Sequence, residues 1–229
     1  MKRTAILVDG GFYQKRANYI FGEKSPADRA DELIKYCHRH LQNDDDLYRI
    51  FYYDCRPSEK KVYHPLTKKT VDLKKNPIYK WYDDFFSRII TKRKVALRLG
   101  ELLETSTEYM LTPSAMKKLC RKEISVDELT EADFSLNVQQ KGVDMRIGLD
   151  IASMAQKRLV DQIILIAGDS DFVPAAKHAR REGIDFILDP LWQSIKPSLS
   201  EHIDGLNTKV PKPGLGKTDP LSAKPDKII

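Results

Sequence analysis

Short runs of β-branched and aliphatic residues alternate along this chain with segments in which apolar residues recur every three to four positions. The apolar runs predict strands at residues 4–8, 47–53, 94–99, 163–166 and 184–188. The helical spacing predicts helices at residues 14–21, 27–41, 77–90, 143–159, 172–181 and 192–204. Such alternation is typical of a parallel sheet whose strands are connected by helices. We therefore predict a Rossmann-like α/β fold, a parallel sheet with helices on both faces in three layers (α/β/α).

Acidic residues follow two of the predicted strands. The first strand ends at Asp9, and the strand at 163–166 is followed closely by Asp169 and Asp171. In open α/β sheets, ligands bind beyond the carboxyl ends of the strands. Neighbouring carboxylates repel one another unless a cation or a proton lies between them, and Mg²⁺ and Mn²⁺ prefer such oxygen ligands. Asp9 also has a purely structural alternative, because Asp is a favoured N-cap of the helix that follows a strand.

A further pair of carboxylates lies on the helix predicted from residue 143. Asp144 falls in its first turn, where the helix dipole favours a negative charge whether or not a ligand binds. Asp150 follows six residues later, about 240° further around the helix. The two side chains cannot share one helix face, so we expect Asp150 to support a site from behind and not to bind the same metal.

The predicted domain covers residues 1–207 and contains two insertions. One lies near residues 58–76 and is rich in Lys, and the other lies near residues 104–138 and mixes short helical pieces with acidic turns. Residues 208–229 combine Pro, Lys and Gly with little apolar content, so we predict a disordered basic tail.

The insertion near 58–76 allows two interpretations. Its lysines are either a solvated face or an arm that contacts phosphates, with Tyr63 and His64 available to stack on bases.

Composition adds a basic charge balance. The chain has 229 residues, a net charge of +6 and a pI of about 9.0, which favours a polyanionic partner. Mean hydropathy is −0.48 and no apolar stretch reaches membrane-spanning length, so we expect a soluble cytoplasmic protein with no membrane partner. Cys37, Cys55 and Cys120 are widely spaced, which argues against a disulfide framework and against a zinc site.

These motifs together resemble the NYN-domain family, relatives of the PIN-type nucleases, and most closely its LabA-like bacterial branch. The resemblance covers roughly residues 3–205 and rests on residues 8–11, 141–144 with Asp150, and 168–174. It implies a PIN-like parallel α/β fold in which acidic residues hold Mg²⁺ or Mn²⁺ for hydrolysis of RNA. The residues that it makes both catalytic and metal-binding are Asp9, Asp144, Asp169 and Asp171. Many members have Asn shortly after the first Asp, whereas this chain has Gly10-Gly11-Phe12-Tyr13.

Other polar residues near the motifs receive supporting roles. Asp150 and Ser170 are expected to hold the four carboxylates in place from outside the metal's ligand shell. Cations that flank the motifs are expected to contact the RNA backbone, namely Lys15, Arg16, Lys141 and Arg146.

The sequence thus predicts a ribonuclease that requires Mg²⁺ or Mn²⁺ and acts on RNA, single-stranded in preference to double-stranded. A homo-oligomer stays open. The alternative is a non-catalytic RNA-binding or regulatory protein, which the missing Asn favours. A phosphatase with an aspartyl-phosphate intermediate needs a second Asp two residues after the first, where this chain has Gly11.

Overall fold

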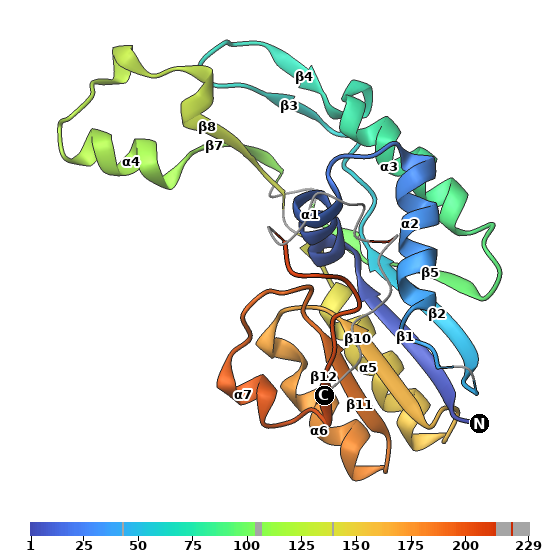
Figure 1. Cartoon of the computed structure of the whole chain (residues 1–229). Helices are drawn as coiled ribbons and strands as arrows, with labels where there is room; N and C mark the ends of the chain where they lie inside the picture. Colours follow the sequence, from blue (N-terminus) through green and yellow to red (C-terminus); the bar gives the residue numbers. More distant parts are fainter. Residues whose placement is uncertain (43, 104–106, 139, 214–220, 222–229) are drawn as a thin grey trace. The chain divides into compact units, whose positions relative to one another are not determined.

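The computed structural model describes residues 1–42, 44–103, 107–138, 140–213 and 221. The described residues form a six-stranded sheet in which all neighbouring strands are parallel, in the order β12-β11-β10-β1-β2-β5 (Figure 1). The strands are β1 (Arg3–Asp9), β2 (Asp46–Asp54), β5 (Val95–Leu99), β10 (Gln162–Ile166), β11 (Asp185–Asp189) and β12 (Gly205–Leu206). The apolar runs became strands because both faces of the sheet are covered, and residues 5–8 of β1 have no exposed surface.

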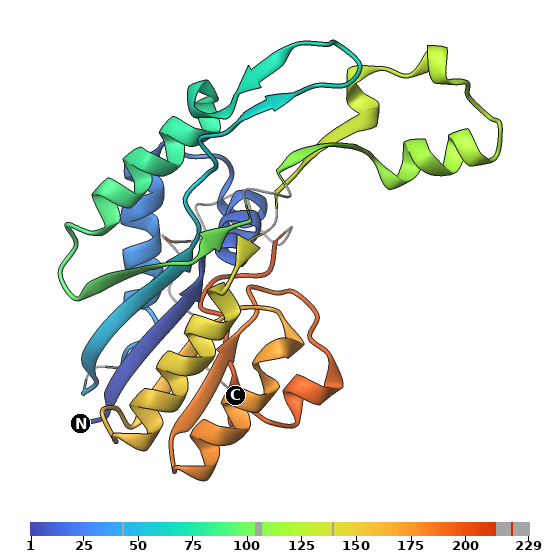
Figure 2. The ribbon, with the colours of Figure 1, turned by 180° about the vertical axis from the view of Figure 1, so that it is seen from behind.

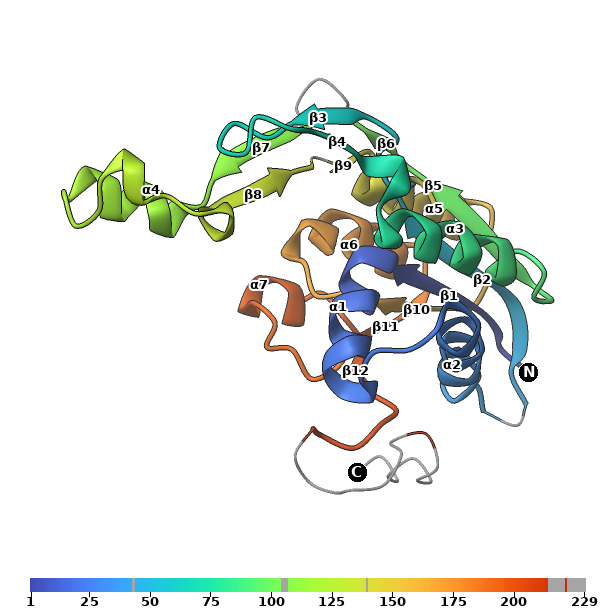
Figure 3. The same ribbon diagram turned by 90° about the horizontal axis from the view of Figure 1, so that it is seen from above.

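Helices cover both faces of this sheet. They are α1 (Gly10–Phe21), α2 (Pro26–His38), α5 (Val143–Gln156) and α6 (Val173–Arg181). Figures 2 and 3 show α5 and α6 side by side on one face and α1 and α2 on the other. The residues of α5 that were spaced for a core, including Val143, Ile147 and Ile151, are buried. The predicted three-layer α/β/α fold is therefore confirmed.

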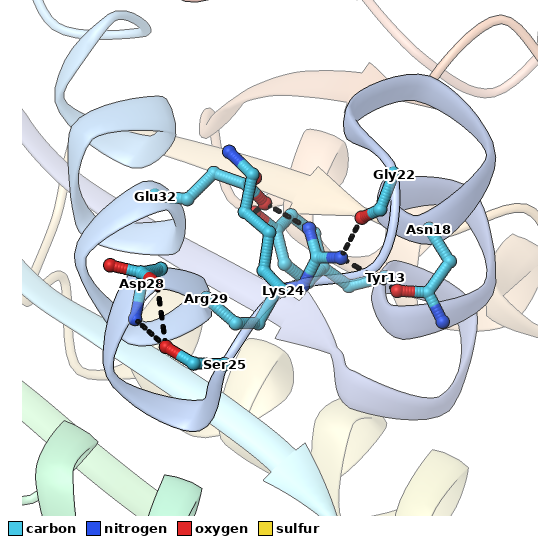
Figure 4. A network of polar contacts seen from close by, with 8 residues as sticks. All are labelled: Tyr13, Asn18, Gly22, Lys24, Ser25, Asp28, Arg29 and Glu32. Carbon is cyan, nitrogen blue, oxygen red and sulfur yellow. Dashed lines mark hydrogen bonds and ion pairs between the residues drawn. The ribbon is translucent and has the colours of Figure 1, made fainter.

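A buried polar network fixes α1 against α2 (Figure 4). The Arg29 guanidinium on α2 is fully buried, and it donates to Glu32 at 2.5 Å and to Asn18 and the Gly22 carbonyl, both at 2.6 Å. The Tyr13 hydroxyl on α1 donates to the same Glu32 carboxylate at 3.1 Å. Because a buried charge is costly unless it is paired, this network also specifies how α1 leaves the end of β1.

The chain divides into two compact units. The sheet unit comprises Met1–Asp54, Asp84–Gly100 and Gly142–Ile229, and the hairpin unit comprises Cys55–Asp83 and Glu101–Lys141. The segments predicted as insertions, 58–76 and 104–138, fall inside the hairpin unit. Helix α3 (Pro77–Ile89) continues from the hairpin unit into the sheet unit, where Phe85 packs against Tyr52.

The hairpin unit consists of three antiparallel strand pairs and a short helix among its described residues. The pairs are β3 (Lys61–Tyr63) with β4 (Thr70–Asp72), β6 (Glu101–Leu102) with β9 (Gln140–Lys141), and β7 (Glu108–Leu111) with β8 (Phe134–Asn137). The helix is α4 (Pro113–Cys120), and single 3₁₀ turns lie at Leu73–Lys75, Val126–Glu128 and Glu131–Asp133. His64 is buried, with its ring 4.4 Å from that of Tyr109 and 5.2 Å from that of Phe134, so it belongs to the core of this unit and cannot stack on a base.

The prediction of a helix over residues 192–204 is wrong. Only α7 (Pro197–Ser200) forms there, because Leu191 and Trp192 adopt positive φ angles of 46° and 63°. Two successive left-handed residues turn the chain and cannot start a right-handed helix. Within the described residues, no helix is long and apolar enough to span a membrane.

The start of the predicted disordered tail also needs correction. The Thr208 hydroxyl donates to Asp189 at 2.7 Å, the Trp192 indole donates to the Val210 carbonyl at 2.8 Å, and Val210 is buried. The folded part therefore extends at least to Val210. Most of the predicted tail, residues 214–220 and 222–229, lies outside the described residues.

Shortening the C-terminus at two points should separate its docked part from the rest. A chain that ends after residue 207 loses the Thr208 hydrogen bond and the buried Val210 side chain, which together contribute about 2–3 kcal/mol. We expect its melting temperature to fall by about 5–10 °C in a calorimetric scan. A chain that ends after Pro213 retains these contacts and should melt with the full-length protein. Equal melting of all three chains would contradict the docking.

Candidate active site at the carboxyl edge of the sheet

Asp9 is the last residue of β1 and the N-cap of α1. Its Oδ1 atom accepts a hydrogen bond from the Phe12 amide at 3.1 Å. The structural alternative considered for Asp9 is thus part of its role, although one cap leaves the other carboxylate oxygen available. The sharp turn requires glycine next to Asp9, because a Cβ on Gly10 would lie 2.6 Å from both the Tyr53 carbonyl oxygen and the Asp54 Oδ2 atom.

Asp169 lies shortly after the end of the neighbouring strand, β10. β1 and β10 pair in parallel with Val8 opposite Ile166, so the chain leaves both strands at the same edge. Asp169 caps the 3₁₀ turn Ser170–Phe172 by accepting from the Asp171 amide at 3.1 Å. Asp169 and Asp171 are both exposed at this edge.

Asp144 reaches the same neighbourhood from a third element. It lies in the first turn of α5, directly after Gly142, whose φ of 81° makes the turn into the helix. The charges of Asp144 and Asp169 both act on Asp9, and those of Asp169 and Asp171 act on Asp144. Asp144 therefore lies within electrostatic range of the other three predicted carboxylates, and Asp169 lies within range of Asp9.

Burial and repulsion both disfavour the charged forms of Asp9 and Asp144. Burial first, then the charges of Asp144 and Asp169, raise the pKa of Asp9 from 3.8 to about 6, although hydrogen bonds from the backbone oppose the rise. Burial and the charges of Asp169 and Asp171 also raise the pKa of Asp144. In the described part of the chain, none of the four forms an ion pair with Lys, Arg or His. The cluster thus carries negative charge that no ion pair among the described residues balances.

The donor chemistry suits a hard cation. Carboxylates without nearby His or Cys are the ligands that Mg²⁺ and Mn²⁺ prefer, whereas zinc favours nitrogen and sulfur. Among the described residues, no group of three or more His, Cys, Asp or Glu side chains converges into a ready-made metal cage. Like charges favour separated side-chain rotamers, so binding of a cation would require the carboxylates to turn toward it.

A family model describes this part of the chain. The model of the NYN domain matches residues 85–202, which include Asp144, Asp169 and Asp171 but not Asp9. The chain belongs to the NYN domain family. NYN domains are PIN-like nucleases that act on RNA and generally depend on a divalent metal, which agrees with an acidic cluster at the carboxyl edge of a parallel sheet.

Comparisons with whole proteins add little to the family assignment. No curated protein matches the chain. Among solved structures, a protein of unknown function from Vibrio parahaemolyticus is 13% identical, with 90% of this chain and 91% of that chain covered and a TM-score of 0.45.

The supporting residues of the NYN domain have defined partners. Asp150 accepts from the Tyr53 hydroxyl at 2.8 Å and pairs with Arg98 at 3.2 Å, so it ties α5 to β2 and β5. This contact lies on a different helix face from Asp144, as the helical angle predicts. Ser170 accepts from the Lys196 ammonium at 3.1 Å, which holds a cation beside the Asp169 turn.

The four cations predicted to bind RNA have different environments. Arg16 donates from Nε and Nη2 to the Leu191 carbonyl, at 3.0 and 2.6 Å, so its guanidinium fastens the loop after β11, and its predicted phosphate contact stays a prediction. Lys15 and Arg146 are exposed in the sheet unit, and Lys141 belongs to β9 of the hairpin unit.

The loop after β11 that Arg16 holds was not predicted from the sequence. A Cβ on Gly168 would lie 2.5 Å from Phe12 Cε2 and 2.8 Å from Gln193 Nε2, so both side chains close over the backbone just before Asp169. Phe12, which lies in the stretch where many family members have Asn, thus packs on Gly168, and the Gln193 amide lies over the same glycine. The clue in the sequence was Pro190 after a strand, which marks a turn but does not say where that turn leads.

Proposed function

We propose that this NYN-domain protein is a ribonuclease of the LabA-like branch that hydrolyses RNA phosphodiester bonds in the cytoplasm with Mg²⁺ or Mn²⁺. Asp9, Asp144, Asp169 and Asp171 are proposed as the catalytic and metal-binding residues. The observation that carries the proposal is the unbalanced charge of this cluster at the ligand-binding edge of a parallel sheet. Carboxylates kept together at a cost in repulsion are typical of functional sites.

The chemistry divides between the cation and the protein. A divalent cation supplies an activated water and withdraws charge from the scissile phosphate. Asp9 and Asp144, whose charged forms burial and repulsion disfavour, would turn toward the cation, which would stabilise those charges. Asp150 and the Arg16-held loop keep the supporting elements in place, and the exposed Lys15 and Arg146 are available to contact the RNA backbone. We propose single-stranded RNA as the substrate because the chain's basic excess favours a polyanion.

A non-catalytic RNA-binding protein is the second candidate. The observation that favours it is Phe12, which occupies the region where many family members have Asn and contributes no ligand for a metal or water. In that case the carboxylates would still bind a cation, but RNA would dissociate intact.

The test is cleavage of end-labelled single-stranded RNA, and separately DNA, with Mn²⁺, Mg²⁺ or EDTA. We expect wild-type protein to cleave RNA only with a metal, and Asp169→Asn to be slower by at least about 100-fold, since loss of a charged ligand removes several kcal/mol of transition-state stabilisation. Asp44→Asn is the matched control, because Asp44 is exposed just before β2 at the opposite edge of the sheet. Binding without cleavage would favour the second candidate, and equal cleavage by Asp169→Asn would refute the site.

A further inference from the structure

One segment of the hairpin unit is strongly basic. Residues 55–83 contain eight Lys and Arg against three Asp and Glu, a net +5, while the whole chain has +6. The other segment of the hairpin unit, residues 101–141, contains five Lys and Arg against eight Asp and Glu. The hairpin unit thus has a net charge of +2 and the sheet unit +4, and within the hairpin unit the positive charge lies in the segment that contains β3 and β4.

The β3–β4 hairpin exposes several of these charges. Along β3, Val62 is buried, while Lys61 and Tyr63 on either side of it point to solvent, and Tyr63 is 57% exposed. The turn that follows is closed by hydrogen bonds of 2.9 Å between His64 and Lys69 and between Lys68 and His64. Lys68 and Lys69 are exposed at this tip. The exposed Tyr63 ring thus lies on the same hydrogen-bonded hairpin as the exposed lysines.

The opposite side of the hairpin explains why it keeps its shape. The buried His64 ring packs against Tyr109 and Phe134, which belong to the β7–β8 pair of the same unit. Anchoring by one face leaves the other face without a covering element among the described residues. A two-stranded hairpin is marginal by itself, so these ring contacts keep Tyr63 and its neighbouring lysines in place.

The exposed lysines of this hairpin differ from other cations of the segment in their ion pairs. Other cations of the segment have partners, since Lys74 pairs with Glu59 at 2.8 Å and Arg56 pairs with Asp83 at 3.1 Å. Lys61, Lys68 and Lys69 form no ion pair in the part of the chain that the structure describes. Their charges therefore remain available to a polyanion.

The chain enters the hairpin unit twice. The chain enters this unit after Asp54 and again after Gly100, which follow the carboxyl ends of β2 and β5. β2 is the neighbour of β1, and Tyr53 lies opposite Asp9 in the register. Both connections thus start from the edge of the sheet that carries the carboxylates.

We propose that the exposed face of the β3–β4 hairpin, formed by Lys61, Tyr63, Lys68 and Lys69, binds single-stranded RNA. The lysines contact backbone phosphates and the Tyr63 ring stacks on a base, the combination by which proteins hold single strands without reading their sequence. The proposal rests on the proposed function for its choice of RNA as the polyanion. It extends that function by giving the substrate a binding surface separate from the carboxylates.

The test measures binding apart from cleavage. Fluorescence anisotropy of a labelled single-stranded RNA oligonucleotide is followed with full-length protein in EDTA, at several salt concentrations. We expect Tyr63→Ala to weaken binding about tenfold and Tyr63→Phe to bind like the wild type, because stacking needs the ring and not the hydroxyl. The triple variant Lys61→Gln, Lys68→Gln, Lys69→Gln should bind more weakly and reduce the slope of log affinity against log salt by about 2.

A triple variant from the same unit is the matched control. Lys117→Gln, Lys118→Gln and Lys122→Gln remove the same charge from the acidic segment around α4 and should leave most of the affinity and the Tyr63 effect intact. Wild-type affinity for both hairpin variants, equal weakening by Tyr63→Phe and Tyr63→Ala, or no binding of single-stranded RNA by the wild type would each overturn the proposal. Loss of cleavage in Mn²⁺ with hairpin-dependent binding retained would instead refute only the proposed catalysis.

Discussion

Replacing Asp9 with Asn is expected to stabilise the metal-free protein at neutral pH and to abolish RNA cleavage. Asp9 is charged at pH 7 at a cost, because burial and the charges of Asp144 and Asp169 raise its pKa to about 6. Asn keeps an Oδ1 atom that can accept from the Phe12 amide, so the cap of α1 survives. The variant loses the repulsion together with the ligand, a combination typical of functional sites, where activity and stability compete.

The pH dependence of stability follows from the pKa of Asp9 in the unfolded chain, 3.8, and in the folded chain, about 6. Well below pH 3.8 the Asp9 carboxyl is protonated in both the folded and the unfolded chain and does not affect stability. Between pH 3.8 and about 6 the folded chain holds the proton more tightly, so wild-type stability falls as pH rises through this window. Above it the charged Asp9 costs about 1–3 kcal/mol, and Asp9→Asn should be more stable than the wild type by that amount.

Urea unfolding in EDTA at pH 4.5 and pH 7.5 measures this difference. The gain of Asp9→Asn should be small at the lower pH and full at the higher one. Asp150→Asn is the control, because Asp150 already has Tyr53 and Arg98 as partners and its loss should not stabilise the protein. A variant Asp9→Asn that is less stable than wild type at pH 7.5 would show that the carboxylate is not under repulsion.

The effect of Mn²⁺ on the melting temperature is a second test of the Asp9→Asn variant. Mn²⁺ should raise the melting temperature of the wild type more at pH 7.5 than at pH 5.5, because a protonated carboxyl must lose its proton before it can bind the cation. Asp9→Asn should show a much smaller rise at both pH values. An equal Mn²⁺ effect in both proteins would remove Asp9 from the proposed ligands.

The fold could be predicted because strands that are buried on both faces of a sheet have a recognisable apolar sequence. A parallel strand covered by helices must be apolar throughout, so β1 and β10 were evident as short aliphatic runs. The region after β11 could not be predicted in this way. Its turn at Leu191 and Trp192 is held by Arg16 and by the Val210 carbonyl, contacts from distant parts of the chain that override the local helical pattern.

The candidate site was partly predictable for a similar reason. Parallel strands end at one edge, so Asp9 and Asp169 were expected together once their strands were recognised. Strand ends alone do not distinguish them from Asp54 and Asp189, which also end strands but are buried. Asp189 accepts from His40 at 2.9 Å and has no exposed surface, so it serves the core. Only tertiary packing determines whether a carboxylate at the end of a strand is buried in the core or accessible to a ligand.

Replacing Gly10 with Ala should be among the most damaging single changes in the sheet unit. The new methyl carbon would lie 2.6 Å from the Tyr53 carbonyl oxygen, 2.6 Å from Asp54 Oδ2 and 2.7 Å from Tyr52 Cε1. The first of these atoms is backbone of β2, which is paired on both sides and cannot move without disturbing the sheet. We expect a loss of about 3 kcal/mol or more and a drop in melting temperature of at least about 6 °C.

The adjacent glycine provides an unusually close control. A Cβ on Gly11 would meet only Asp9 Oδ1, at 3.7 Å, which is an ordinary contact. Both positions lie in the first turn of α1, so Ala should add helix propensity at either site, and Gly11→Ala should be neutral or more stable by up to about 1 kcal/mol. Melting curves of the two variants therefore compare the same substitution in the same turn.

The Gly10 clash also has a consequence for the site. Shortening the neighbouring side chain in the double variant Gly10→Ala, Asp54→Ala should not restore stability, because the Tyr53 carbonyl oxygen remains in the way. Relief must come from a shift of the turn that carries Asp9, so cleavage should fall further in Gly10→Ala than the lost stability explains when measured well below its melting temperature. If Gly10→Ala melts with the wild type, β1 and β2 do not approach each other at this edge as the structure shows, and the placement of Asp9 beside the other carboxylates fails with it.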